Sequence, residues 1–187
     1  MATPSELPRD PEQAAVAVVA HAESRPPTLG TGRLVCVDGL AGAGKTTLAA
    51  AIGRVCPGTV VLATDEMLEG WGGLPGLGAS IEALLRPLAA GRPGRWRRWD
   101  WYADRWAEWR EVSPAPLLVL EGVGSGASSY ADLVTTVVWV EAPAADRRDR
   151  WLDREGDARH FASWAADEAA LHERERARDR ADLVLRT

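Results

Sequence analysis

The feature that most constrains the fold is a glycine-rich run, GLAGAGKT, that extends from Gly39 to Thr46. It fits the phosphate-loop pattern G-x-x-x-x-G-K-[ST]. The preceding residues 33–38 are apolar and partly β-branched and predict a buried strand, whereas residues 45–55 predict a helix. A glycine turn in this setting directs backbone N–H groups and a helix N-terminus at phosphate oxygens. The pattern therefore predicts a site for a nucleoside triphosphate; the alternative is a chance glycine turn.

Lys45, inside this run, is the only lysine among 22 Lys and Arg residues. Arginine fills every other cationic position, so position 45 has a requirement that arginine does not meet. A compact ammonium on a flexible stem can contact the β- and γ-phosphates inside a tight loop, whereas a planar guanidinium is too wide. We therefore expect Lys45 to bind the phosphates and to act in catalysis.

The loop and its flanks have expected roles in binding ATP and Mg²⁺, with GTP as the open alternative to ATP. Thr46 offers its hydroxyl to Mg²⁺, and Thr47 lies near the inner phosphates. Asp38 either contributes to the Mg²⁺ shell or pins the loop. The residues expected to bind the nucleotide are Gly39, Ala41, Gly42, Ala43, Gly44, Lys45, Thr46 and Thr47.

Short apolar strands alternate with helices along the rest of the chain. Further strands are predicted at 59–63, 115–122, 135–142 and 181–186, and helices at 11–24, 80–90, 143–155 and 160–180. The Pro-rich residues 1–10 are expected to be loose, and the Gly-rich residues 69–78 to form a loop. The pattern predicts an α/β fold, a three-layer sandwich with a five-stranded, mostly parallel sheet.

Composition argues against several classes of protein. The net charge of −5 and the pI near 5.3 are unusual for a general nucleic-acid binder. No apolar run approaches the ~18 residues of a membrane span, and no signal peptide is apparent. Cys36 and Cys56 lie in or beside apolar segments, as free thiols of a reducing compartment do. These features predict a cytoplasmic protein with no membrane contact.

Phosphate loops occur in switches, motors and kinases, so other features must distinguish these classes. A GTPase usually recognises guanine through N-K-x-D, but the chain contains no asparagine. It has no LSGGQ-like segment and is short for a transporter or helicase motor. The small P-loop kinases remain.

Five segments, in order, resemble the uridine kinase-like branch of the P-loop nucleoside/nucleotide kinase superfamily, from about Arg33 to Val184. They are VDGLAGAGKTT, LATDEM, LVLEGV, VVWVEAPAADRRDRWLDRE and RDRADLVL. The resemblance implies transfer of the γ-phosphoryl group of ATP·Mg²⁺ to a hydroxyl of a small molecule, with a nucleoside as the leading acceptor. The length of 187 residues fits one domain over 1–187. We expect an N-terminal helix and linker (1–32), an Arg- and Trp-rich acceptor-side insertion (91–112) and, as the resemblance implies, a lid region (143–160).

Two acidic residues follow strands at the edge where parallel sheets bind ligands. The resemblance implies that Asp65 contacts the substrate and accepts the proton of the attacking hydroxyl, with Glu66 as a weaker candidate. The alternative for Asp65 is a helix N-cap. Glu121 is expected to orient Mg²⁺ or to contact the substrate. The alternative is a strand-end carboxylate that binds nearby backbone N–H groups.

Arg147, Arg150 and Arg154 recur at helical spacing and share one helix face. The resemblance places them on a lid helix, where they would neutralise charge on the transferred phosphoryl group. The alternative is a solvated face paired with neighbouring acidic residues.

The insertion at 91–112 holds five of the nine tryptophans. Trp99, Asp100 and Trp101 resemble a family segment that contacts the nucleoside, with Asp100 on sugar hydroxyls and Arg105 nearby. Trp71 either flanks the acceptor pocket or packs under its glycine loop. The alternatives are a helical or hairpin insertion with a tryptophan core, or stacking on single-stranded nucleic acid.

Other functions remain open on the sequence. They are a kinase of a non-nucleoside alcohol, a polynucleotide kinase, which the acidic composition disfavours, and a non-catalytic P-loop protein that drives a partner switch.

Overall fold

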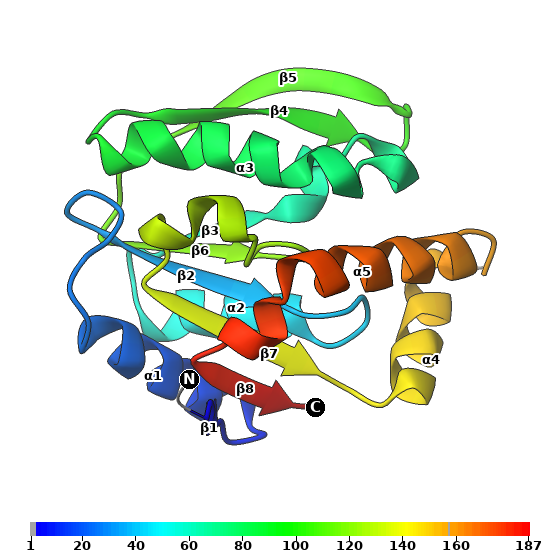
Figure 1. Ribbon diagram of the computed structural model, residues 1–187, viewed down its shortest axis with the longest axis horizontal. Helices are drawn as coiled ribbons and strands as arrows, with labels where there is room; N and C mark the ends of the chain where they lie inside the picture. The colour runs from blue at the N-terminus through cyan, green and yellow to red at the C-terminus, as the bar shows by residue number, and fades with distance from the viewer. Residues whose placement is uncertain (1–2, 157) are drawn as a thin grey trace.

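A six-stranded parallel sheet forms the centre of the computed structural model, which describes residues 3–156 and 158–187 (Figure 1). The strand order is β1-β8-β7-β2-β6-β3. The strands are β1 (Ser5–Glu6), β2 (Arg33–Asp38), β3 (Val60–Ala63), β6 (Leu117–Glu121), β7 (Thr136–Glu141) and β8 (Leu183–Arg186). This order places β2, and the loop that follows it, between β7 and β6.

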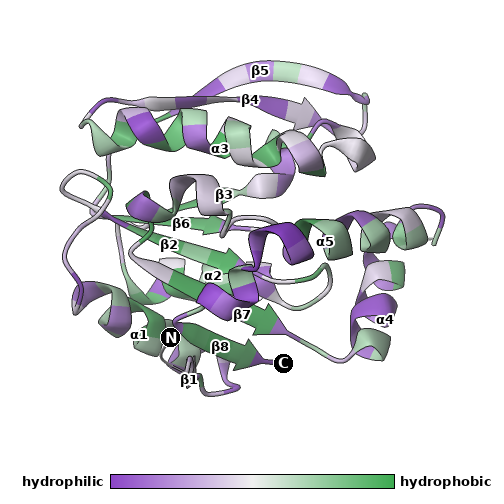
Figure 2. Cartoon of the chain, viewed as in Figure 1, coloured by the Kyte–Doolittle hydropathy of each residue, from purple (hydrophilic) through white to green (hydrophobic). Residues whose placement is uncertain are grey.

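Helices cover both faces of the sheet, as the sequence predicts for a three-layer α/β fold. They are α1 (Pro11–Glu23), α2 (Lys45–Val55), α3 (Leu74–Ala89), α4 (Ala144–Glu155) and α5 (Phe161–Glu175), with short 3-10 helices η1 (Thr64–Met67), η2 (Gly70–Gly72), η3 (Ser128–Leu133) and η4 (Ala177–Arg180). Along β2, Val35 and Val37 join one buried cluster with α1 and α2, whereas Leu34 and Cys36 join another with α3 and α5. The central strands are accordingly hydrophobic on both faces (Figure 2).

The sheet has one strand more than the sequence predicts. Residues 1–10 were expected to be loose, yet Ser5 and Glu6 pair in parallel with Leu183 and Val184. The backbone N–H of Leu7 donates to the carbonyl of Val184 at 2.8 Å, and the Leu7 side chain is buried. A two-residue strand between prolines has no periodicity of its own, because its pairing partner lies at the other end of the chain.

Two helices differ from their predicted bounds. The glycine-rich residues 69–78 are not all loop, because α3 already begins at Leu74. Leu74, Leu77 and Ile81 are buried at helical spacing, and this burial outweighs the low helix propensity of the intervening glycines. At the other end of the chain, α5 stops at Glu175 because Arg176 adopts a left-handed backbone with φ of 50°. Among the described residues, no helix has the length and apolar character to cross a bilayer.

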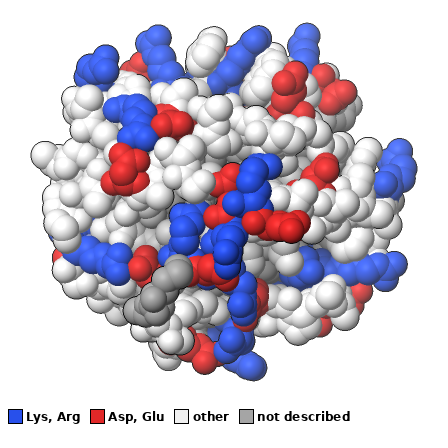
Figure 3. Space-filling view, in the orientation of Figure 1, with Lys and Arg blue, Asp and Glu red and all other residues white. Residues whose placement is uncertain are grey.

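The tryptophan-rich insertion is an antiparallel hairpin of β4 (Gly94–Asp100) and β5 (Arg105–Val112), separate from the main sheet. Trp96 and Val112 point inward and join the buried cluster of α3. The outer face carries Arg95, Arg97 and Trp109, which are exposed. Basic and acidic side chains both lie along this edge of the molecule (Figure 3). Of the two forms that the sequence left open for the insertion, helical or hairpin, the hairpin is observed, with Trp96 and Trp99 buried.

Candidate active site

The loop between β2 and α2 has the backbone shape that phosphate binding requires. Gly39, Gly42 and Gly44 adopt φ values of 146°, 76° and 98°. A Cβ at Gly39 would lie 2.1 Å from the Val140 carbonyl oxygen, so only glycine fits. Helix α2 begins at Lys45 with no side-chain cap hydrogen bond. Its first N–H groups therefore face the loop as donors for an anion.

The Lys45 side chain lies inside this loop and is only 8% exposed. Its Nζ donates to the carbonyl oxygens of Gly39 and Leu40, at 2.8 and 3.0 Å. Burial lowers the pKa of the ammonium, and the nearby charges of Asp38, Glu168, Asp65 and Glu121 oppose this shift. One buried cation thus faces a group of carboxylates at the carboxyl edge of the sheet.

Asp38 holds the start of the phosphate loop through hydrogen bonds to backbone N–H groups. Its Oδ1 accepts from the backbone N–H groups of Gly39, at 2.7 Å, and Gly124, at 2.9 Å. Its Oδ2 accepts from the N–H of Gly126, at 3.0 Å. The side chain is 1% exposed. Both oxygens are therefore engaged with backbone, and these contacts match the loop-pinning alternative for Asp38 rather than a place in a Mg²⁺ shell.

Thr46 and Glu121 lie together beside Lys45. The Thr46 hydroxyl donates to Glu121 Oε1 at 3.1 Å, and Glu121 is buried at the end of β6. Burial, and then the charge of Asp65, raises the pKa of the Glu121 carboxyl, against the opposing effect of Lys45. A hydroxyl and carboxylates are hard oxygen donors of the kind that Mg²⁺ prefers. Among the described residues, no group of three or more His, Cys, Asp or Glu could hold a metal by itself, so an ion here would be shared with phosphates.

Asp65 follows β3, whose last residue, Ala63, pairs with Glu121. It lies in η1, which has no side-chain cap hydrogen bond, so the N-cap alternative finds no support. The side chain is exposed, while its backbone carbonyl accepts from Trp101 Nε1 at 3.0 Å. A solvent-facing carboxylate close enough to affect the pKa of Glu121 and Lys45 can receive a proton from a bound molecule.

The three arginines of α4 do not act alike. Arg147 Nη1 donates to the carbonyl oxygen of Ala41 at 3.4 Å, and Arg150 Nη1 donates to that of Gly42 at 3.0 Å. Arg154 instead pairs with Glu155 at 2.7 Å and lies over the Trp151 ring. Two of them therefore reach the phosphate loop, and the third pairs beside its own helix, although its charge still acts to lower the pKa of Glu121.

Glu168 of α5 is a loop contact that the sequence did not reveal. Its Oε1 accepts from the backbone N–H of Ala41 at 2.6 Å and from Trp164 Nε1 at 2.9 Å. The side chain is 2% exposed, and burial raises the pKa of its carboxyl. Nothing in the sequence distinguishes this glutamate from the other acidic residues of a highly charged helix.

Trp71 is the centre of an aromatic cluster that joins three parts of the molecule. Its ring is stacked on His160, with centroids 4.7 Å apart. It also meets Trp101 of the hairpin turn, Trp151 of α4 and Trp164 of α5, with centroids 5.0 to 5.7 Å apart. A cavity of about 190 Å³ opens beside these rings, lined by Trp71, Trp151, Glu155, Arg159 and His160. The hairpin turn, helix α4 and helix α5 thus meet at the Trp71 ring.

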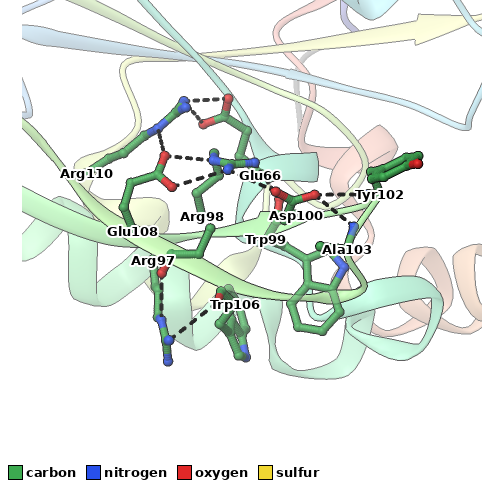
Figure 4. A network of polar contacts seen from close by, with 11 residues as sticks. Glu66, Arg97, Arg98, Trp99, Asp100, Tyr102, Ala103, Trp106, Glu108 and Arg110 are labelled. Atoms are coloured by element: carbon green, nitrogen blue, oxygen red, sulfur yellow. Dashed lines mark hydrogen bonds and ion pairs between the residues drawn. The ribbon is translucent and has the colours of Figure 1, made fainter.

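Two of the remaining hairpin candidates, Trp99 and Asp100, have their partners within the hairpin (Figure 4). Asp100 Oδ1 accepts from the backbone N–H groups of Tyr102 and Ala103, at 3.1 and 3.0 Å, so it shapes the turn. Trp99 is buried against Trp106. Arg105 is exposed and stands opposite Asp100 in the strand register. The structure brings Trp101 to the backbone of Asp65 and Trp71 to Trp101, whereas Trp99 and Asp100 have their printed partners inside the hairpin.

A larger cavity, of about 490 Å³, lies on the other side of the loop, at the carboxyl ends of β7 and β8. Leu40 of the phosphate loop and Arg147 of α4 line it, together with Pro143 and Arg186. Crevices at this end of an open α/β sheet are where ligands bind. This cavity gives room for the part of a nucleotide beyond its phosphates.

The parallel sheet, the phosphate loop and the flanking helices together form a P-loop kinase-like fold. The chain is similar to a structure described as a possible uridine kinase from Bacillus stearothermophilus, at 20% identity with a TM-score of 0.65, over 91% of this chain and 97% of that one. It is also similar to a candidate fructose transport system kinase from Silicibacter sp. TM1040, at 24% identity with a TM-score of 0.60, over 91% and 98%. No protein-family model matches the sequence, and comparison with curated proteins found no match. The likeness confirms the expected fold.

Proposed function

We propose that the protein is a P-loop kinase that transfers the γ-phosphoryl group of ATP to a hydroxyl of a small molecule, with Mg²⁺. The observation that carries this proposal is the meeting of Lys45, the Thr46–Glu121 pair and the exposed Asp65 at the carboxyl ends of three adjacent strands. A protein that only bound nucleotide would have no need of an exposed carboxylate facing this group. The similarity to kinase structures supports the same class.

Each residue has a physical task in this reaction. Lys45 would exchange its two loop carbonyls for phosphate oxygens, and the loop N–H groups would bind the remaining oxygens. Thr46 and Glu121 would hold Mg²⁺, directly or through water. Bound ATP·Mg²⁺ would supply the phosphoryl group. Asp65 would take the proton from the acceptor hydroxyl. The hydroxyl oxygen would bond to the γ-phosphorus while the bond from that phosphorus to the β–γ bridging oxygen breaks. Arg147 and Arg150 would stabilise the charge on the transferred group.

The acceptor would lie against Trp101, whose indole N–H binds the Asp65 carbonyl, and against Trp71, whose ring contacts Trp101. Flat rings favour a molecule with a flat face, and a nucleoside combines such a face with primary and secondary hydroxyls. The resemblance in sequence to uridine kinases points the same way. A non-nucleoside alcohol is the second candidate, supported by the similarity to the fructose transport system kinase.

A substrate panel tests the proposal. Purified protein would be incubated with ATP or GTP, Mg²⁺ and either nucleosides, sugars or other small alcohols, and product would be detected by mass spectrometry. We expect one acceptor class to be phosphorylated, and Asp65→Asn to lower kcat by about 10²- to 10⁴-fold, the usual contribution of a general base. Asp132→Asn, on an exposed aspartate that pairs with Arg86, is the matched control and should leave the rate unchanged. Slow hydrolysis that ignores both the acceptor and Asp65→Asn would favour a non-catalytic switch instead.

A further inference from the structure

The tip of the phosphate loop is held from two helices at once. Arg147 and Arg150 of α4 donate to the carbonyl oxygens of Ala41 and Gly42. Glu168 of α5 accepts from the N–H of Ala41, at 2.6 Å. The peptide groups on both sides of Ala41 are thereby fixed in direction. A loop that binds phosphate through backbone N–H groups depends on these directions, because each donor must aim at an oxygen.

The Glu168 side chain is held in this position by burial and by two hydrogen bonds. It is 2% exposed, and a buried carboxylate is costly unless hydrogen bonds compensate it. Its Oε1 takes two of them, from Ala41 and from the indole N–H of Trp164 one helical turn before it. The Trp164 ring in turn packs against Trp71. The side chain therefore has a fixed direction, set by α5 itself and by the aromatic cluster.

We propose that Glu168 is a positioning residue for nucleotide binding, which holds the Ala41 N–H and so keeps the loop tip in the conformation that receives the polyphosphate. This inference rests on the proposed nucleotide site, but it is separate from the proposed transfer reaction. This role requires a side chain long enough to reach Ala41 more than it requires a negative charge, because the contact is one hydrogen bond to the backbone.

Two substitutions separate the effect of side-chain length from the effect of charge. Glu168→Gln keeps the length of the side chain and an oxygen acceptor but removes the charge. Glu168→Asp keeps the charge but is one methylene shorter and withdraws from Ala41. Affinity for Mg·ATP and for Mg·tripolyphosphate would be measured by calorimetry. Tripolyphosphate has no base or ribose, so an equal effect on both ligands would locate the change at the loop.

We expect Glu168→Asp to weaken both affinities by about tenfold, the upper end of the range for one ordinary hydrogen bond, and Glu168→Gln to stay within about threefold of the wild type. Trp164→Phe removes only the supporting donor and should have a smaller effect than Glu168→Asp. Glu175→Ala is the matched control, because this glutamate is on the same helix and binds Ser128 instead of the loop. Urea unfolding of every variant would show whether a loss of affinity merely follows a loss of stability.

The outcomes are distinguishable. If Glu168→Asp binds as well as the wild type, or more tightly, or if Glu168→Gln loses as much affinity as Glu168→Asp, the positioning role is wrong and the proposed kinase function is untouched. If the wild type binds neither Mg·ATP nor Mg·tripolyphosphate, the nucleotide site itself is wrong and this inference falls with it.

Discussion

The carboxylates around the phosphate loop and those of the hairpin have opposite environments. Glu121 and Glu168 are buried beside one lysine, and burial raises the pKa of both carboxyls. In the hairpin, Arg98 is bound to Glu108 and Asp100 (Figure 4). The Arg98 hydrogen bond lowers the pKa of Glu108 to about 2. The pKa of Asp100 is also lowered, first by its backbone hydrogen bond to Ala103.

This difference separates a binding site from a scaffold. Most charged groups of the hairpin have an oppositely charged partner, within the hairpin for Arg95 and Arg98 and in η1 for Arg110. Around the loop, Lys45 and the arginines of α4 lie among four carboxylates, and two of these, Glu121 and Glu168, are buried with a raised pKa. In the proposed reaction, Mg²⁺ would add positive charge at Glu121, and the hairpin would contact the acceptor through the Trp101 ring.

The largest effect is expected at the single ammonium. Lys45→Arg should weaken binding of Mg·ATP by about 100-fold or more, because a wide guanidinium cannot fit between the carbonyls of Gly39 and Leu40 and still face phosphate. Calorimetry with Mg·ATP would measure it. The matched control is Arg54→Lys, an exchange between the same residue types at an exposed position on the same helix. Unchanged affinity and turnover in Lys45→Arg would contradict the whole account of the loop.

A smaller effect is expected from the hairpin. Trp101→Phe removes the indole donor to the Asp65 carbonyl and alters the ring contact with Trp71. We expect kcat/KM for the acceptor to fall by about tenfold, the value of one hydrogen bond and part of an aromatic contact, with the affinity for Mg·ATP unchanged. Trp109→Phe, on the exposed face of the same hairpin, should change neither constant. Equal losses for ATP and acceptor would show that the hairpin does not act on the acceptor side alone.

The smallest effect is expected on the free energy of unfolding. Its dependence on pH has one sign for Glu168, beside the loop, and the opposite sign for Glu108 of the hairpin. Because the pKa of Glu168 is raised, the folded state binds its proton more tightly, and stability falls as the pH rises from the ordinary value of 4.5 through the raised pKa. Glu168→Gln should remove this dependence, so its stability relative to the wild type should increase from pH 4 to pH 7. Urea unfolding across this range would measure it.

Glu108→Gln supplies the opposite case. The pKa of Glu108 is lowered, so its stabilisation is present above 4.5 and is lost as the pH falls toward 2. This variant should therefore be slightly less stable than the wild type at pH 7 and approach it at low pH. The same trend in both variants would contradict the assigned environments.

The sequence predicted best where structure depends on local residues. β2 and α2 match their predicted bounds, because an apolar run, a glycine turn and an amphipathic helix follow one another directly. The strand at Ser5–Glu6 was missed because its partner lies at the far end of the chain. The form of the insertion stayed open because tryptophan density fits a hairpin and a helix equally well.

The candidate site divides in the same way. The loop glycines and Lys45 form one contiguous motif, so they could be identified from the sequence. Glu168 could not, because its contact with Ala41 spans 127 residues and exists only once α5 packs on the loop. The distinct partners of Arg147 and Arg154 depend likewise on where α4 begins and how it turns.

The Trp71 ring, shared by the hairpin turn and both helices after β7, has a practical consequence. No one of these elements can shift without separating a pair of indoles or lifting His160 from its stack. Such a separation changes the energy transfer between the indole rings. The intrinsic tryptophan fluorescence should therefore report any relative movement of these elements, without an attached dye.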